Sequence, residues 1–199
     1  AFDLVSLGGG PSGRGTSARK TRVSGLTEFG GEFPVAALAE EIDTPGDGQI
    51  RALVTAAGNP VLSTPNGSRL DRALPELDFL LSIDFYLNET SRHAHLILPP
   101  TFALERDHYD VIFHALAIRN TAKYCSPLFE RAETARHDYE IFAALTQGLE
   151  ARDERKKTGV FATLRDRWLT PRRTLALALR FGPYGARWNP FADGLTLSR

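Results

Sequence analysis

Residues 79–83 read Phe-Leu-Leu-Ser-Ile and are followed at once by Asp84, and this stretch decides how the chain folds. Its apolar side chains do not alternate with polar ones, which is typical of a strand with both faces buried. Two other short apolar runs, Ile50–Ala56 and Leu96–Leu98, lie on either side of it in the sequence. We therefore expect three buried strands in this part of the chain.

Segments with helical spacing separate these runs. Before the first run, Pro34 stands where a helix can begin, and apolar residues follow at helical spacing up to Ile42. Between the runs, the expected helices are Asn66–Glu76 and Glu89–Ala94. Strands separated by helices predict an α/β fold with a mostly parallel sheet. Right-handed crossovers would place helices on both faces, which gives a three-layer α/β/α, doubly wound arrangement.

The composition divides the chain into three parts. Residues 1–33 are rich in Gly, Ser, Thr and Arg and have little periodicity, so we expect an irregular segment there. Residues 34–150 form the expected α/β domain, which ends in a helix whose apolar stripe includes Ile141 and Leu145. Residues 151–199 are expected to be a helical appendage and tail, with amphipathic segments at Val160–Leu169 and Leu175–Phe181.

Charge and composition exclude several classes of protein. The 199 residues carry 24 basic and 24 acidic side chains, so the chain lacks the basic surplus of a general nucleic-acid binder. Cys125 is the lone cysteine, which excludes an internal disulfide framework and a complete four-cysteine zinc or iron–sulfur site. No apolar run reaches the roughly 18 residues of a membrane span. The lack of Met predicts an excised or processed piece of a longer protein.

The ends of the expected strands carry the most informative polar residues. In a parallel α/β sheet, ligands bind beyond the carboxyl ends of the strands. The first run ends at Gly58-Asn59-Pro60 and the second at Asp84. Glycine permits close approach of a backbone, Asn offers both a donor and an acceptor, and Asp can accept the two neighbouring N–H groups of a guanine edge. The same residue types are common in turns and caps, so the spacing alone leaves both interpretations open.

Three other features suggest different chemistry. The run Gly8–Gly13 matches the glycine fingerprint of a flavin-binding domain, but the residues after it give a helix no apolar face, and Glu28 is a poor substitute for the acidic residue expected about 20 residues later. Several histidines lie near one another without a spacing typical of zinc sites; they are His93, His95, His108 and His114. Cys125 has no positioned base in the sequence, which favours a packed side chain over a nucleophile.

Taken together, the motifs of residues 50–105 resemble those of the molybdopterin oxidoreductases. These are the bis-molybdopterin guanine dinucleotide enzymes, which include formate dehydrogenases, nitrate reductases and dimethyl sulfoxide reductase. Their pattern is a Gly-x-Asn-Pro-like turn, a strand ending in Asp, a Glu-Thr pair, then Ala-Asp-Val-Ile-Leu-Pro and a Glu shortly after. The corresponding elements occur here in the same order, as Gly58-Asn59-Pro60, Asp84, Glu89-Thr90, Ala94–Pro99 and Glu105.

The resemblance extends from about Arg22 to Leu149. It implies that this part of the chain binds the guanosine and pyrophosphate part of the dinucleotide. It implies that the turn holding Asn59 approaches the cofactor, and that Asp84 with the backbone of Ile83 holds the guanine. Arg106 stands where the family often has a Lys near the cofactor. The implied cofactor-binding residues are Gly58, Asn59, Pro60, Ile83, Asp84, Arg106 and Asp138. No catalytic residue and no metal ligand is implied in this chain.

Two positions depart from the family pattern. His95 stands where the family has the Asp of Ala-Asp-Val-Ile-Leu-Pro, so the role of that Asp is lost or rewired. After Glu105 many members read Glu-Gly, whereas this chain continues with residues 106–109, Arg-Asp-His-Tyr, which leaves the contacts on the pterin side open.

The resemblance implies a molybdopterin-dependent oxidoreductase in the intact protein, where Mo or W carries out two-electron redox chemistry on a small substrate. The metal ligand and a 4Fe–4S cluster are expected outside this chain, so the chain alone is expected to be inactive. The expected partners are the remaining domains of the polypeptide and an electron-transfer partner, in the cytoplasm, with no nucleic acid and no membrane segment. The alternatives are a non-catalytic α/β nucleotide-binding or scaffold module and a flavin-linked enzyme that uses Gly8–Gly13.

Overall fold

The computed structural model contains a three-stranded parallel sheet in the order β3-β4-β5. The structure describes residues 16–110, 113, 117–119, 121, 123–152, 170–189, 191 and 193–197. The strands are β1 Thr16–Lys20, β2 Thr27–Phe29, β3 Ala52–Ala56, β4 Phe79–Ile83, β5 Leu96–Ile97, β6 His108–Tyr109 and β7 Tyr124–Cys125. The helices are η2 Val35–Ala37, α1 Leu38–Asp43, α2 Pro60–Ser63, α3 Gly67–Ala73, η3 Leu74–Glu76, η4 Ser91–His93, η5 Ala103–Glu105, α4 Asp138–Glu150 and α6 Pro171–Phe181.

Helices pack against both faces of β4. Side chains of α1 and α3 form a buried apolar cluster with Leu80, whereas Ile141 of α4 packs with Leu81 and Ile83. Successive residues of a strand point to opposite faces, so Leu80 and Leu81 contact different helices. The α/β class and the parallel sheet are thus confirmed, and the doubly wound arrangement as a whole stays a prediction.

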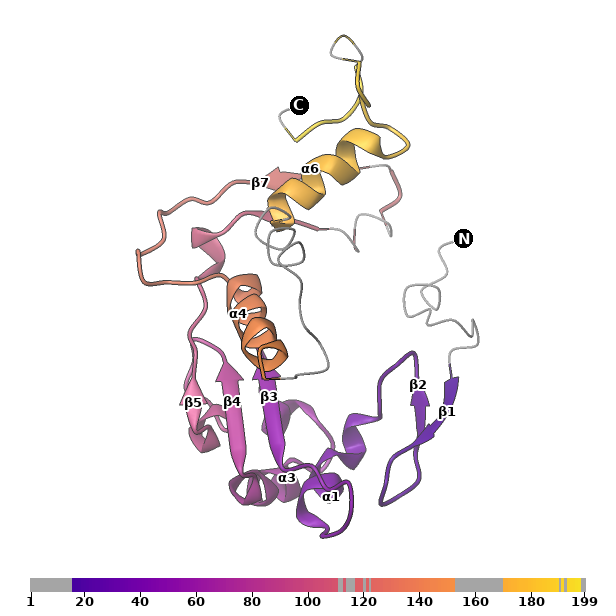
Figure 1. Cartoon of the computed structure of the whole chain (residues 1–199), viewed down its shortest axis with the longest axis vertical. Helices are drawn as coiled ribbons and strands as arrows, with labels where there is room; N and C mark the ends of the chain where they lie inside the picture. The colour runs from indigo at the N-terminus through magenta and orange to yellow at the C-terminus, as the bar shows by residue number, and fades with distance from the viewer. Residues whose placement is uncertain are drawn as a thin grey trace.

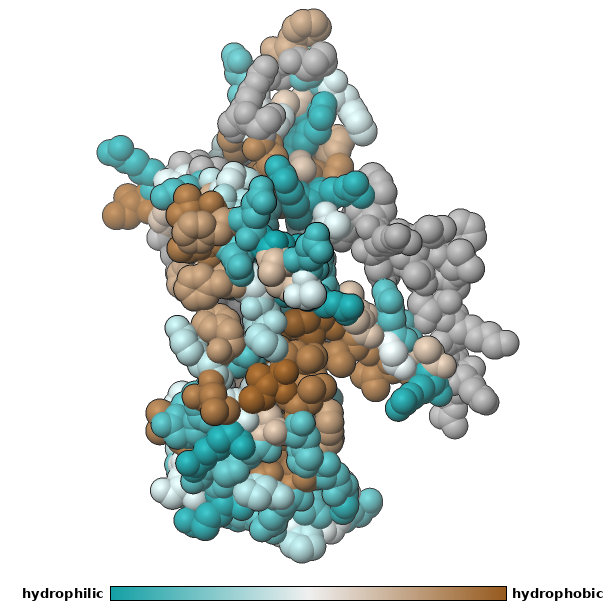
Figure 2. Space-filling view, turned by 90° about the vertical axis from the view of Figure 1, so that its left-hand side faces the viewer, coloured by the Kyte–Doolittle hydropathy of each residue, from teal (hydrophilic) through white to brown (hydrophobic). Residues whose placement is uncertain are grey.

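The burial of the strands is uneven. Leu80 and Leu81 in β4 are 0% and 2% exposed, whereas Val54, which pairs with Leu81 across the sheet, is 51% exposed. The prediction of strands buried on both faces is therefore correct for β4 and wrong for β3 and β5. Val54 in β3 and Leu96 in β5 are 51% and 46% exposed, because the described helices do not cover these side chains. Figure 2 shows hydrophobic side chains gathered at mid-height of one face of the molecule, above a hydrophilic lower part.

Residues 16–33 are not irregular, which corrects the expectation for the N-terminal part. Strands β1 and β2 pair in antiparallel fashion, and the Thr21 backbone N–H donates to the Leu26 carbonyl at 2.8 Å. Arg22 connects this hairpin to the end of α1. Its Nη2 donates to the Thr44 carbonyl at 2.6 Å, and its Nε forms an ion pair with Glu41 at 3.2 Å. Such contacts join residues far apart in the sequence, so local periodicity does not reveal them.

Other elements agree with the sequence in position and differ in length. The short helix expected over Glu89–Ala94 is the single turn η4, and the pairing of β6 with β7 was not predicted. Helix α6 confirms the expected C-terminal amphipathic segment. The expected segments Gly8–Gly13 and Val160–Leu169 lie outside the described residues. Within the described residues, every helix is too short or too polar to cross a membrane.

The carboxyl ends of β3, β4 and β5 meet at one edge of the sheet. The three arrows point the same way in Figure 1, toward the region where α4 lies. The turn after β3, the loop after β4 and the chain after β5 therefore start close together, and these segments build the candidate site.

Candidate functional site

The turn after β3 is anchored to the end of β4. The backbone N–H of Ala57 donates to the Ile83 carbonyl at 2.9 Å, and Ala57 has a φ of 49°, in the left-handed region. Pro60 occupies the start of α2, where a missing N–H costs no intrahelical bond. The turn thus holds Gly58 and Asn59 at the carboxyl edge of the sheet.

The side chain of Asn59 is bound to the loop that follows β4. Its Oδ1 accepts a hydrogen bond from the Thr90 hydroxyl at 2.8 Å, and its Nδ2 donates to Oε2 of Glu89 at 2.6 Å. The Asn59 amide lowers the pKa of the Glu89 carboxyl from its ordinary value because it donates to the charged form. Thr90 is fully buried, and its hydroxyl accepts from the Val61 N–H at 3.1 Å.

Asp84 is a buried carboxylate directly after β4. It is 7% exposed, and each oxygen accepts one hydrogen bond, Oδ1 from the Tyr86 N–H at 2.9 Å and Oδ2 from the Asn88 side chain at 3.1 Å. Asn88 in turn accepts from the N–H groups of Thr90 and Ser91 at 3.0 and 2.9 Å. The loop is therefore rigidly bonded, while a carboxylate oxygen with two lone pairs can accept a second bond from a ligand.

Arg106 and Asp138, predicted separately, lie together in a second group. Arg106 Nη1 and Asp138 Oδ2 are 2.6 Å apart. Asp138 opens α4, where the helix dipole favours a negative charge, and Glu140 closes the first turn by accepting from the His137 N–H at 2.8 Å. Among the described residues, Oδ1 of Asp138 is buried and has no hydrogen-bond partner.

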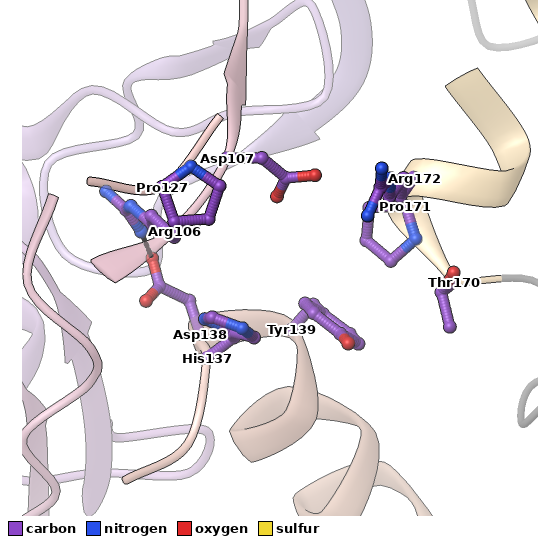
Figure 3. Close-up of a pocket in the computed structure, with 9 residues that line it drawn as sticks. All are labelled: Arg106, Asp107, Pro127, His137, Asp138, Tyr139, Thr170, Pro171 and Arg172. Atoms are coloured by element: carbon purple, nitrogen blue, oxygen red, sulfur yellow. Dashed lines mark hydrogen bonds and ion pairs between the residues drawn. The ribbon is translucent and has the colours of Figure 1, made fainter. Parts of the chain in front are cut away.

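This second group lines a cavity of about 460 Å³. Figure 3 shows the Arg106–Asp138 pair on one side, the start of α6 with Arg172 on the other, and the ring of Tyr139 between them. Burial raises the pKa of the Tyr139 hydroxyl from its ordinary value. The lining residues are Arg106, Asp107, Pro127, His137, Asp138, Tyr139, Thr170, Pro171 and Arg172.

Two contacts connect the groups at the same end of the sheet. The rings of Phe85, which follows Asp84, and Phe102 are 5.5 Å apart between centroids. The Thr101 hydroxyl and Nδ1 of His137 lie 2.7 Å apart. The chain that leaves β5 is therefore fixed both to the loop after β4 and to the start of α4.

Two of the histidines suggested by the sequence, His93 and His95, have structural partners. Nε2 of His93 lies 2.7 Å from the Asp71 carboxylate, and Nδ1 of His95 accepts from the Leu80 N–H at 3.0 Å. Among the described residues there is no group of three or more side chains suited to hold a metal ion. Cys125 lies half-buried in β7, and His114 lies outside the described residues.

Several residues of these groups have roles that the sequence does not indicate. Glu89 and Thr90 form the Glu-Thr motif, but nothing local in the sequence indicates that they hold Asn59. The run of polar residues from Asn88 to Ser91, directly after a strand that ends in Asp, is the signal that could have found this network. The cavity residues Tyr139 and Arg172 carried no comparable signal.

The chain is thus an α/β domain with a parallel sheet and with polar residues gathered at the carboxyl edge, where α/β sheets bind their ligands. A family model described as molybdopterin oxidoreductase matches residues 8–147. The chain belongs to this family, which confirms the resemblance of its motifs.

Curated relatives agree with this assignment. The chain is 28% identical over 166 residues to the dimethyl sulfoxide/trimethylamine N-oxide reductase of Rhodobacter capsulatus, which covers 72% of this chain and 20% of that protein. It is 35% identical over 108 residues to the protein of the same name from Cereibacter sphaeroides, covering 50% and 13%. It is 29% identical over 111 residues to the assimilatory nitrate reductase catalytic subunit of Bacillus subtilis (strain 168), covering 55% and 15%. The chain spans a fifth or less of the length of these relatives.

Proposed function

We propose that this chain is a cofactor-binding domain of a molybdopterin-dependent oxidoreductase. Its carboxyl edge would bind the guanosine and pyrophosphate part of a bis-molybdopterin guanine dinucleotide that carries Mo or W. The observation that carries the proposal is Asp84, a carboxylate 7% exposed at the end of β4 whose two oxygens each accept one protein hydrogen bond and can accept more. The paired donors of a guanine edge, N1–H and the 2-amino group, match that remaining capacity.

The other residues have complementary tasks. Gly58 and Pro60 shape a turn whose backbone can approach phosphate closely, next to the carbonyl of Ile83. Arg106 supplies a positive charge at the cavity, where it pairs with Asp138. The unpartnered Oδ1 of Asp138 fits a hydrogen-bond donor on the ligand, because a buried acceptor without a partner is unfavourable.

When bound, the cofactor supplies the redox chemistry, and this chain binds and orients it. In the intact protein we propose two-electron redox chemistry on a small substrate, with the metal ligand and a 4Fe–4S cluster in other domains of the polypeptide. The electron-transfer partner and the cytoplasmic location stay predictions. The family match begins at residue 8 and so includes the Gly8–Gly13 run, which favours this family over a flavin-linked enzyme. A non-catalytic nucleotide-binding or scaffold module remains the alternative.

Calorimetric titration of the chain with GMP and AMP tests the proposal. We expect GMP to bind more tightly than AMP. The substitution Asp84→Asn should weaken GMP binding by roughly tenfold or more, because a charged acceptor of two N–H groups is lost. Asp78→Asn is the matched control, since Asp78 lies just before the amino end of β4 in an exposed pair with Arg51. Equal affinity for GMP and AMP, or an unchanged affinity in Asp84→Asn, would contradict the proposal.

The intact protein gives a second test. Acid hydrolysis should release GMP from the purified protein, which should also contain Mo or W. A protein with neither, isolated from cells able to make the cofactor, would favour the scaffold alternative.

A further inference from the structure

The carboxamide of Asn59 has two ends of similar shape and opposite hydrogen-bonding character. Its oxygen accepts, and its nitrogen donates two hydrogens, so the neighbouring groups decide which end points where. In this structure both ends contact the loop after β4, through Thr90 and Glu89. The orientation of the amide is therefore determined by these two side chains.

Thr90 selects the oxygen. Its hydroxyl already accepts from the Val61 N–H at 3.1 Å, and its single hydrogen is directed to Oδ1 of Asn59 at 2.8 Å. Thr90 is 0% exposed, so no water competes for that hydrogen. If the amide were flipped, its N–H group could donate to the second lone pair of the hydroxyl, but the buried hydroxyl hydrogen would lose its acceptor, which is unfavourable.

Glu89 selects the nitrogen. An ionised carboxylate only accepts hydrogen bonds, and Oε2 of Glu89 lies 2.6 Å from Nδ2 of Asn59. The pKa of Glu89 is lowered by this bond, which keeps the group ionised. A flipped amide would place its oxygen against the carboxylate oxygen, a repulsive contact.

One N–H of Asn59 is left over. Nδ2 carries two hydrogens, Glu89 takes one, and no other described residue takes the second. Asn59 is half-buried at the end of β3, and Asp84 follows β4, the neighbouring strand. The edge thus offers a donor from Asn59 beside an acceptor from Asp84.

We propose that Thr90 and Glu89 are positioning residues that fix Asn59 as a donor, so that this turn recognises an acceptor oxygen of the ligand. The inference rests on the proposed function and assigns the hydrogen-bonding sense of one group in the site. A guanine carbonyl and a phosphate oxygen share this acceptor chemistry. Guanosine and GMP, used as separate ligands, distinguish the two sources.

The experiment measures the affinities of the chain for GMP and guanosine by calorimetry in three variants. Thr90→Val removes the hydroxyl at nearly constant volume, and we expect GMP affinity to fall roughly tenfold. Thr90→Ser restores the hydroxyl and should recover the affinity to within about twofold. Glu89→Gln lets the side chain donate, which permits the flipped amide, and should lower the affinity in the same direction as Thr90→Val.

Thr64→Val is the matched control. The Thr64 hydroxyl donates to the Pro60 carbonyl at 2.7 Å beside the same turn and has no contact with the Asn59 amide. This variant should therefore bind GMP like the wild type. If affinity falls for GMP and not for guanosine, Asn59 contacts the phosphate; if it falls for both, Asn59 contacts the base.

The outcomes separate the two proposals. If the wild-type chain binds GMP no better than AMP, the proposed function fails and the inference falls with it. If the wild type prefers GMP and Thr90→Val and Glu89→Gln bind it equally well, only the positioning role is overturned. Glu89 is partly exposed, so Glu89→Gln tests the inference even if Thr90→Val does not fold.

Discussion

His95 makes a hydrogen bond that explains why it can stand where the family pattern has Asp. Its Nδ1 accepts from the Leu80 N–H at 3.0 Å, and its own backbone N–H donates to the Leu80 carbonyl at 2.8 Å. The side chain therefore extends the hydrogen-bonding between β4 and the chain that enters β5. A carboxylate is also an acceptor, so an Asp at this position could accept a hydrogen bond from the same N–H group.

The substitution His95→Leu removes the acceptor of the Leu80 N–H, and the burial of Leu80 indicates how much the free energy of unfolding should fall. His95→Leu leaves the N–H of Leu80, a residue 0% exposed, without its partner. An unsatisfied buried donor costs about 1–3 kcal/mol. His95 itself is exposed, so water can replace part of the bond, and we expect about 1–2 kcal/mol. For a chain of this length, this corresponds to a fall in Tm of about 2–8 °C.

Urea unfolding followed by circular dichroism measures this difference. His95→Asp and His95→Asn retain an acceptor, so their free energies of unfolding should stay within about 0.5 kcal/mol of the wild type. The slope of the free energy of unfolding against urea concentration should not change, because unfolding exposes the same surface in all variants. A His95→Leu protein as stable as the wild type, or a His95→Asp protein as unstable as His95→Leu, would refute the reasoning.

Two further predictions concern stability. Leu80→Ala should lower the free energy of unfolding by about 2–5 kcal/mol, since it opens a cavity in the core. The control Leu62→Ala, at a site 68% exposed, should change it by less than about 0.5 kcal/mol. Similar losses of stability in the two variants, measured by urea unfolding, would contradict the assigned core. Arg69 donates to Asp43 at 2.7 and 2.8 Å and holds the pKa of that carboxyl below its ordinary 3.8. The folded protein therefore binds this proton less readily than the unfolded chain, so the stabilisation is complete above the ordinary pKa and is lost as the pH falls through the lower folded value. Asp43→Asn should reduce the loss of stability on acidification from about pH 5 to pH 2, measured by urea unfolding, and an unchanged pH dependence would argue against it.

The sequence determined the elements whose signal is local. The apolar run 79–83 predicts β4 with its bounds as observed, and helical spacing predicts α1, α3 and α6. The spacing of two residues in the sequence fixes whether their side chains lie on the same face of a strand or helix. The pattern of apolar residues that must be buried therefore predicts these elements. The family and the carboxyl-edge location of Asn59 and Asp84 were likewise accessible from motif order.

Only the tertiary structure decided how the polar groups pair. Nothing local indicates that Asn59 is held by Glu89 and Thr90, or that Arg106 meets Asp138. The same holds for the pairing of β1 with β2 and for the hydrogen bond from Leu80 to His95, which local sequence does not indicate either. A hydrogen bond between residues distant in sequence depends on the distance and angle of two atoms after folding. Residue type fixes only whether each group can donate or accept a hydrogen bond. The sequence therefore predicts which polar groups are candidates, and the tertiary structure determines which of them bond to each other.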